Sequence, residues 1–215
     1  MTIDSASNAR PLSARRWLSG VTLSIGMALA ATASVQAEPR DYVIDPEHLA
    51  VGFLVQHIGY AKVLGMFRKA EGSYRFDEQS AAMSDLRVAV DTGSVFSNHK
   101  KRDEHLRSAD FLNSKEFPQM VFTAAGARRS GERSFTIDGQ LQLLGKTQPL
   151  TLEATWNKSG EYPFGGGLLG GNPYVMGVSA RGSFKRSAYG MNYAVDNGWV
   201  GDDVELIIEF EARRQ

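Results

Sequence analysis

The sequence contains no cysteine, and this absence limits both how the fold is stabilised and what chemistry it can perform. Disulfide bonds and a catalytic thiol are excluded. Stability must come from a buried core, and 215 residues are enough to form one. The Gly-x-Ser-x-Gly pattern of a hydrolase nucleophile elbow is also missing.

An excess of positive charge is missing as well, because the 24 basic residues are balanced by 24 acidic ones. Residues 1–37 contribute three arginines and one acid, so the chain from Glu38 has a formal charge of about −2. A nucleic-acid binder needs a basic stripe that neutralises phosphates. The charge balance therefore argues against nucleic acid as a partner.

Only one stretch of the chain, residues 17–33, is a long run of apolar and small residues. Arg15 and Arg16 precede this run, and Val35-Gln36-Ala37 follows it. A basic flank, an apolar region and a small-residue cleavage site are typical of a secretory signal. A membrane anchor is the alternative, but serine, threonine and glycine dilute the run.

We therefore predict a cleaved signal peptide over residues 1–37 and one domain over residues 38–215. In a bacterium with two membranes, the processed protein would reside in the periplasm. The general secretory route fits the sequence better than the twin-arginine route suggested by Arg15-Arg16, and both routes stay open. The chain after the signal contains no second apolar run that could span a membrane.

Alternation of apolar and polar residues dominates the rest of the chain and predicts β-strands. The predicted strands are 49–58, 62–77, 83–92, 119–129, 134–144, 147–158, 174–186 and 203–213. Within 62–77 the apolar parity changes, which predicts a bulge near Arg68-Lys69. Gly145-Lys146 predicts a tight hairpin. Only residues 98–113 are expected to be helical.

Eight antiparallel strands with one apolar face are typical of a barrel or a sandwich, and the periodicity alone does not separate the two. Glycines inside the strands indicate sharp coiling or a close approach to something in the lumen. These glycines are Gly65, Gly72, Gly139 and Gly182. A barrel of eight strands has room for packed side chains or for one slender apolar ligand.

The side chains that share the apolar parity are the candidates for lining such a lumen, although ordinary core packing explains each of them equally well. They are Phe53, Val55, Phe67, Tyr74, Phe76, Val88, Phe122, Leu141, Leu152, Trp156, Met176, Val178 and Phe184. A lipid head group would need donors at the mouth. Arg102, Arg107, Arg181 and Lys185 are candidates for those donors.

Residues 97–117 form a long polar stretch that contains His99, Asp103 and His105. Six residues turn a helix by about 240° net, so the two histidines point apart and no metal site is predicted. An Asp103–His105 acid/base dyad is an alternative, but residues two apart on a helix also diverge. The favoured interpretation is a short solvated helix tied to neighbouring loops by hydrogen bonds.

Two other features have structural interpretations. Residues 160–173 are rich in glycine but lack the Gly-Lys-Ser/Thr ending of a phosphate-binding loop, so we predict a flexible flap over a barrel mouth. His48 and His57 flank an apolar strand, and we expect histidines of the core or lumen that are satisfied by hydrogen bonds.

The segment VDTGSVFSNHKKRDEHLRSADFLNSKEFPQMVF, residues 90–122, resembles the signature of the YceI-like family of lipid- and polyisoprenoid-binding proteins. Residues 42–67, 141–157 and 186–212 resemble the family's opening, central hairpin and closing stretch. The motif positions are Arg102, Asp103, His105, Leu106, Ser108, Asp110, Phe111, Phe117 and Pro118. The chain departs from the family at Phe111-Leu112-Asn113, where an aromatic pair followed by aspartate is usual.

The resemblance covers residues 41–213 and implies an exported, all-β protein with an extended lipocalin-like barrel of eight antiparallel strands and a short helical connection. It implies a long isoprenoid, an isoprenoid quinone or a similar amphiphile in an apolar tunnel, for a carrier, store or sensor. No catalytic residue, metal or cofactor beyond that bound polyisoprenoid or quinone is implied. An exported enzyme using Asp103 and His105, a structural barrel with a filled core, and a homodimer stay open.

Overall fold

The segments with alternating polarity fold into antiparallel strands in a computed structural model that describes residues 38–166 and 171–215. The elements in chain order are β1 (Arg40–His57), β2 (Ala61–Phe67), β3 (Ala70–Asp77), β4 (Ala82–Asp91), η1 (Thr92–Ser94), β5 (Val95–Phe96), α1 (Lys100–Leu106), β6 (Gln119–Ala124), β7 (Arg128–Arg129), β8 (Ser134–Leu143), β9 (Lys146–Glu161), β10 (Tyr174–Lys185), η2 (Arg186–Tyr189) and β11 (Val200–Arg214). The signal peptide predicted for residues 1–37 lies outside the described residues.

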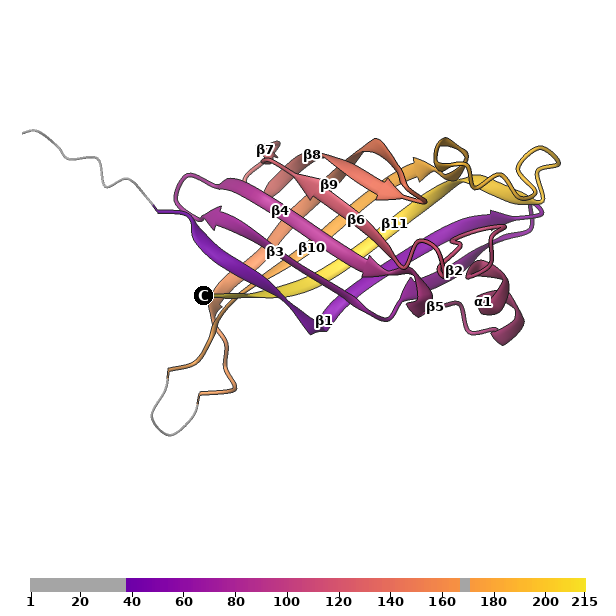
Figure 1. Ribbon diagram of the computed structural model, residues 1–215. Helices are drawn as coiled ribbons and strands as arrows, with labels where there is room; N and C mark the ends of the chain where they lie inside the picture. The colour runs from indigo at the N-terminus through magenta and orange to yellow at the C-terminus, as the bar shows by residue number, and fades with distance from the viewer. Residues whose placement is uncertain (1–37, 167–170) are drawn as a thin grey trace, which may run out of the picture. The chain divides into compact units, whose positions relative to one another are not determined.

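The strands of the described chain close into an antiparallel barrel (Figure 1). Its order is β11-β10-β9-β8-β6-β4-β3-β1, and β1 pairs back onto β11. This confirms the eight-stranded barrel implied by the resemblance. Three further strands extend the barrel, because β2 pairs with the second half of β1, β5 pairs with β2, and β7 pairs with β8. Closure leaves the main strands without a free edge.

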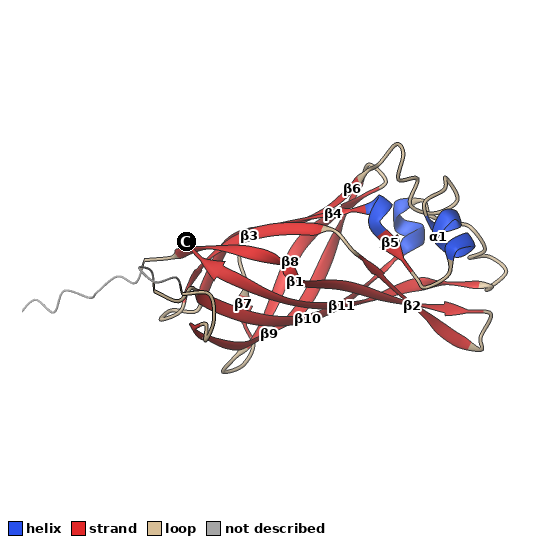
Figure 2. Cartoon of the chain, turned by 90° about the horizontal axis from the view of Figure 1, so that it is seen from below, coloured by secondary structure: helices blue, strands red, loops and turns tan. Residues whose placement is uncertain are grey.

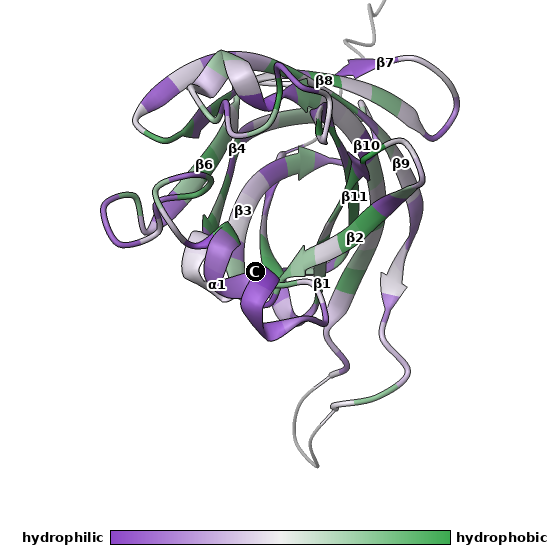
Figure 3. Ribbon diagram, turned by 90° about the vertical axis from the view of Figure 1, so that its right-hand side faces the viewer, coloured by the Kyte–Doolittle hydropathy of each residue, from purple (hydrophilic) through white to green (hydrophobic). Residues whose placement is uncertain are grey.

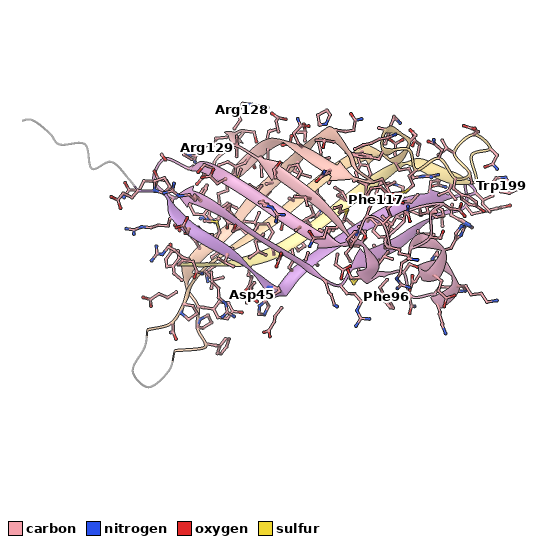
Figure 4. All side chains as sticks on the ribbon, viewed as in Figure 1. Asp45, Phe96, Phe117, Arg128, Arg129 and Trp199 are labelled. Carbon is pink, nitrogen blue, oxygen red and sulfur yellow. The ribbon has the colours of Figure 1, made fainter. Side chains whose placement is uncertain are left out.

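A bend in β1 lets this strand pair with three others. Its register with β11 shifts between Ile44 and Leu49, and Asp45 in this bend is buried. Burial alone would raise the pKa of the Asp45 carboxyl, but hydrogen bonds from His48, the Glu47 N–H and Arg213 hold that pKa below its usual value. The bend therefore rests on a charged, hydrogen-bonded aspartate, which Figure 4 labels at the turn of the strand.

The predicted change of apolar parity near Arg68-Lys69 is confirmed. It occurs at a break between β2 and β3, whereas the prediction was a bulge within one long strand. The Ser94 hydroxyl accepts hydrogen bonds from both backbone N–H groups of this break, at 3.1 Å each. Phe67 before the break and Tyr74 after it are both buried. The break thus keeps the apolar residues of both strands on the inner face.

Two local predictions were inaccurate. Helix α1 is shorter than the predicted span 98–113, because the chain leaves the helix where Ser108 N–H bonds to His105 C=O and the Ser108 hydroxyl bonds to the same oxygen. The hairpin turn lies at Leu144-Gly145, both at positive φ, between the paired residues Leu143 and Lys146.

The helical elements gather at one end of the barrel, which Figure 2 shows from the side and Figure 3 shows end-on. No helix in residues 38–166 and 171–215 is long and apolar enough to cross a membrane. The loop between β9 and β10 leaves the opposite end, and its residues 167–170 are not among those described. The prediction that this loop is a flap stays a prediction.

Two of the strand glycines, Gly65 and Gly139, make room for aromatic rings of the lumen. A Cβ at Gly65 would lie 2.2 Å from the Phe53 ring, and one at Gly139 would lie 2.4 Å from the Phe122 ring. The expected close approach is therefore made by the protein's own phenyl groups, which cover the glycines of neighbouring strands.

We expect Gly139→Ala to lower the free energy of unfolding by about 1–3 kcal/mol, because the new methyl group overlaps the Phe122 ring and the Thr123 carbonyl oxygen. Gly177→Ala in β10 is the matched control, because its Cβ would meet nothing closer than 4.0 Å. Denaturant unfolding of both variants measures the difference. Equal stabilities would contradict the packing described.

Candidate functional site

A cavity of about 120 Å³ occupies the middle of the barrel, and we call it the inner cavity. All of its lining residues are apolar or aromatic. They are Ile44, Leu49, Val51, Tyr74, Phe76, Met83, Leu86, Val88, Val90, Met120, Phe122, Ala127, Phe135, Ile137, Leu141, Leu150, Leu152, Ala154, Trp156, Met176, Val178, Ala180, Phe184, Leu206, Ile208 and Phe210. Empty space with such a lining attracts apolar groups and stays free of water.

Two side chains bring polar atoms to this lining. The Tyr74 hydroxyl donates to the Met176 sulfur at 3.3 Å. Trp156 Nε1 is buried and has no hydrogen-bond partner among the described residues. The inner cavity therefore offers at most one unused donor and no charged group, which suits a hydrocarbon chain.

An aromatic cluster closes the end of the barrel away from α1. The Tyr42 and Tyr74 rings are stacked, with centroids 5.3 Å apart. Tyr42 donates to Glu78 at 2.6 Å, and Tyr174 and Ser159 donate to the same carboxylate. Burial, together with the bond to Glu78, raises the pKa of Tyr42 far above its usual value, so the hydroxyl keeps its proton.

A second cavity of about 310 Å³ lies at the end of the barrel where α1 sits, and we call it the outer cavity. It shares Met120, Phe184 and Leu206 with the inner cavity, so the two follow one another along the barrel. Its other lining residues are Phe53, Val55, Gln56, His57, Ile58, Val63, Phe67, Arg102, His105, Leu106, Phe111, Leu112, Leu143, Arg186, Met191, Tyr193, Ala194, Trp199, Val200 and Val204. Charged side chains enter the lining of the described cavities only here.

All thirteen predicted lumen residues line one of the two cavities. Phe53, Val55 and Phe67 line the outer cavity, Phe184 lines both, and the remaining nine line the inner one. Their contact with a ligand stays a prediction. The prediction omitted the wall from β11, where Leu206, Ile208 and Phe210 face inward. Their alternation with acidic residues in the sequence was the signal that could have placed them there.

Arg186 in η2 was missed as a residue of the site. Only 1% of it is exposed, and its guanidinium donates to the carbonyl oxygens of Gly201, Met191, Tyr193 and Val200. It also lies 5.7 Å from the Phe111 ring centroid. Burial lowers the pKa of Arg186 from its ordinary value. Through these bonds Arg186 holds the loop of residues 190–199 against the start of β11 at the outer cavity.

Of the four basic residues that were candidates for donors at the mouth, only Arg102 lines one of the two cavities. Arg102 lines the outer cavity, whereas Arg107 donates to the carbonyl oxygens of Gly93 and Val95. The prediction was wrong for Arg181 and Lys185, which pair on the outer face with Glu209 and Asp203. Their parity in β10 is opposite to that of the inward-facing Val178 and Phe184.

The motif around α1 is held by hydrogen bonds between its own side chains and backbone. Asp103 is buried and accepts from the Ser97 N–H at 2.7 Å and from the Ser97 hydroxyl at 2.5 Å. Arg102 Nε donates to the same hydroxyl at 2.7 Å. The His99 ring accepts from the Arg102 N–H and caps the helix. The favoured interpretation of a helix tied to its neighbours is what the structure has.

His105 and Asp103 do not form the dyad considered as an alternative. His105 Nε2 instead contacts Asp110 at 2.9 Å, and its ring packs on Phe111 and Tyr193. Leu106 joins the wall of the outer cavity. Within residues 38–166 and 171–215, no group of three potential ligand side chains is arranged to hold a metal ion.

The remaining motif residues fix the return into β6. The Thr92 hydroxyl donates to the Phe117 carbonyl at 2.7 Å, and the Thr92 N–H donates to the Pro118 carbonyl at 3.0 Å. Thr92 itself is fully buried. The hydrogen bonds of residues 92–118 therefore fix α1 and the start of β6 at this end of the barrel, and we call this bonded segment the clamp.

The expectation for the two flanking histidines was wrong in part. His48 is exposed and pairs with Asp45 in the bend of β1. His57 lines the outer cavity but is exposed, because it is the last residue of its strand. Neither histidine is a core residue.

We expect Asp103→Ala to lower the free energy of unfolding by about 2 kcal/mol, because it leaves the buried Ser97 N–H and hydroxyl without their acceptor. Glu104→Ala, one residue further along the same helix and exposed, is the control and should change stability by less than about 0.5 kcal/mol. Thermal unfolding compares them, and equal effects would show that the clamp is not structural.

Comparison with known proteins agrees with this architecture. The YceI-like domain family matches residues 42–212. Protein YceI of Escherichia coli O157:H7 is 39% identical over 181 residues, which are 83% of this chain and 90% of that protein. The crystal structure of the Campylobacter jejuni YCEI protein has a TM-score of 0.65 at 27% identity, covering 74% of this chain and 90% of that one.

A polyisoprenoid binding domain from Saccharophagus degradans shares the fold, with a TM-score of 0.57 at 9% identity, over 81% of this chain and 98% of that one. Since the family match spans most of the barrel and the Escherichia coli relative is well above 30% identical, the chain belongs to the YceI-like domain family.

Proposed function

We propose that this protein binds a long-chain isoprenoid, an isoprenoid quinone or a similar amphiphilic lipid in its barrel, and acts as a carrier, store or sensor. The observation that carries the proposal is the pair of successive cavities, apolar throughout the inner one. Each buried CH₂ group contributes about 0.8 kcal/mol, so a long chain gains affinity without polar contacts.

The distribution of polarity supports one orientation of the ligand. The inner cavity ends at the Tyr42–Tyr74 stack and contains no charged residue. The outer cavity has Arg102, His105 and Arg186 in its lining. The hydrocarbon tail therefore lies in the inner cavity and the polar head group lies near α1.

The comparisons support this proposal at the level of the fold. The Saccharophagus degradans domain is described as polyisoprenoid binding, and its barrel has the same architecture. Its identity to this chain is low, so the proposal for the ligand rests on the two cavities.

Two alternative functions, a structural barrel and an exported enzyme, agree less well with the structure. A structural barrel would have its lumen filled by side chains, and the two cavities argue against that. An exported enzyme would use Asp103 and His105, but their side chains are engaged with Ser97 and Asp110 respectively. The binding function is therefore the better supported one.

Mass spectrometry of an organic extract from natively purified protein tests the proposal. We expect about one long-chain isoprenoid or quinone per protein, because the two cavities share lining residues and follow one another along a single barrel. An empty protein with a measurable turnover on a lipid-like substrate, lost in Asp103→Asn and His105→Ala, would contradict the binding function in favour of an enzyme.

Val178→Trp should abolish lipid uptake, because its side chain lines the inner cavity and the added indole fills the space. Thr155→Trp, on the exposed side of the adjacent strand β9, is the matched control and should leave uptake unchanged. If Val178→Trp fails to fold, the smaller change Ala180→Val in the same wall should reduce uptake. Equal lipid uptake by all three variants would show that the lipid does not bind in the lumen.

We also propose that the protein is exported to the periplasm and that residues 1–37 are removed on the way. The basic flank, apolar run and small-residue site of these residues support the proposal. Cell fractionation with N-terminal sequencing should find a periplasmic chain that starts at Glu38. An intact chain that begins at Met1 in the cytosol would contradict export.

A further inference from the structure

Large apolar side chains are exposed at the end of the barrel where the outer cavity lies. Tyr60 is 91% exposed, Trp199 58% and Ile58 47%. They come from two separate loops, between β1 and β2 and before β11, which the Ile58 N–H joins by donating to the Trp199 carbonyl at 2.8 Å. Figure 4 shows Trp199 at the extreme of this end. We call Ile58, Tyr60, Tyr193 and Trp199 the mouth rim.

The mouth rim is continuous with the wall of the outer cavity. Ile58, Tyr193 and Trp199 are at once exposed and part of the cavity lining. Apolar surface therefore runs from the outside of the protein into the lumen. Scattered exposed apolar residues are ordinary on a protein surface, but a set that surrounds a cavity entrance indicates an interaction site.

The backbone at Ile58 supports a specific use for an apolar side chain at this tip. Its φ is +48°, a conformation that β-branched residues rarely adopt and that glycine or asparagine would adopt at lower cost. Gly59, the next residue, also has a positive φ. The fold thus holds a half-exposed isoleucine in a strained turn, where glycine or asparagine would be more stable.

The chemistry of the rim matches a lipid bilayer. Tryptophan and tyrosine have an apolar ring with a polar edge, and they concentrate at membrane–water interfaces. Lys100 and Lys101 are exposed at the start of α1 at the same end, and lysine side chains beside an apolar insertion favour anionic lipid head groups.

From these observations we propose that the mouth rim docks onto the surface of a lipid bilayer, so that a lipid passes between the membrane and the lumen without crossing water. This inference extends the proposed lipid-binding function. Transfer through water would expose the hydrocarbon chain, at about 0.8 kcal/mol for each CH₂ group. A mouth pressed against the bilayer removes that barrier, because the chain moves directly from one apolar environment to another.

The fluorescence of the chain's own tryptophans can report on docking to vesicles. The chain has three tryptophans, Trp17, Trp156 and Trp199. In the full chain with Trp17→Phe and Trp156→Phe, Trp199 is the only tryptophan, and it lies on the rim. Upon addition of vesicles of phosphatidylethanolamine and phosphatidylglycerol, its emission should shift to the blue. Brominated phospholipids in the vesicles should quench it.

Substitutions test whether vesicle binding depends on the mouth rim or on any exposed apolar side chain. Ile58→Ser combined with Tyr60→Ser should weaken vesicle binding by about tenfold or more, because the inserted apolar area is lost. Phe164→Ser is the matched control, since Phe164 is 72% exposed in the loop at the opposite end. It should change vesicle binding by less than about twofold.

Three results would overturn the inference. Trp199 could stay fully accessible to aqueous iodide when vesicles are present. The Phe164 control could lose binding as much as the rim variant. Trp199 could also become shielded without vesicles, in a concentration-dependent dimer seen by ultracentrifugation, which would make the rim a contact between copies of the chain.

Failure of the docking can be told apart from failure of lipid binding. A protein whose extract contains a lipid but whose rim ignores vesicles retains the proposed function and loses the docking. A protein that docks through the rim but yields no lipid, with or without vesicles, retains the docking and loses the proposed function.

Discussion

The bend of β1 around Asp45 is the constraint on which the barrel depends. One strand pairs with β3 over its first residues, with β2 over its last ones, and with β11 along most of its length. A straight ladder cannot satisfy all three, and the register shift between Ile44 and Leu49 resolves the conflict. The bonds from His48, the Glu47 N–H and Arg213 to the Asp45 carboxylate hold the shift in place.

Closure through β1 and β11 has a consequence for the lumen. The inward faces of the long strands are apolar, and the Phe53 and Phe122 rings lie over glycines of neighbouring strands, where a larger residue would collide with them. Space remains along the axis, closed at one end by the Tyr42–Tyr74 stack and rimmed at the other by Trp199 and its neighbours. The two ends of this space therefore differ, and the lipid that we propose would lie with its tail inside and its head group near α1.

The sequence predicted the elements whose signal is local. Alternation located the strands of the barrel, and the parity change at Arg68-Lys69 located the break between β2 and β3. The first half of β1 was missed because Asp45-Pro46-Glu47-His48 interrupts the alternation that marks a strand. The helix was predicted too long, since polar residues after Leu106 continue the composition of α1 while turning the backbone.

Residues whose role depends on distant partners were harder to place. Arg181 and Lys185 were predicted at the mouth, although the parity of β10 puts them outside. Arg186 follows directly and is buried, because the carbonyl oxygens that it binds come from a loop that folds back on it. Charge alone does not distinguish these three residues in a sequence. The lumen residues were predictable since alternation is a property of each strand by itself.

In the function that we propose, one hydrocarbon chain occupies both cavities in sequence. A crystal structure of protein purified from its native host, without removal of bound lipid, tests it most directly. We expect continuous elongated density from the outer cavity past Phe184 and Leu206 to the Tyr42–Tyr74 stack, with the head group beside α1. A lumen closed by repacked side chains, or one holding only ordered water, would contradict it.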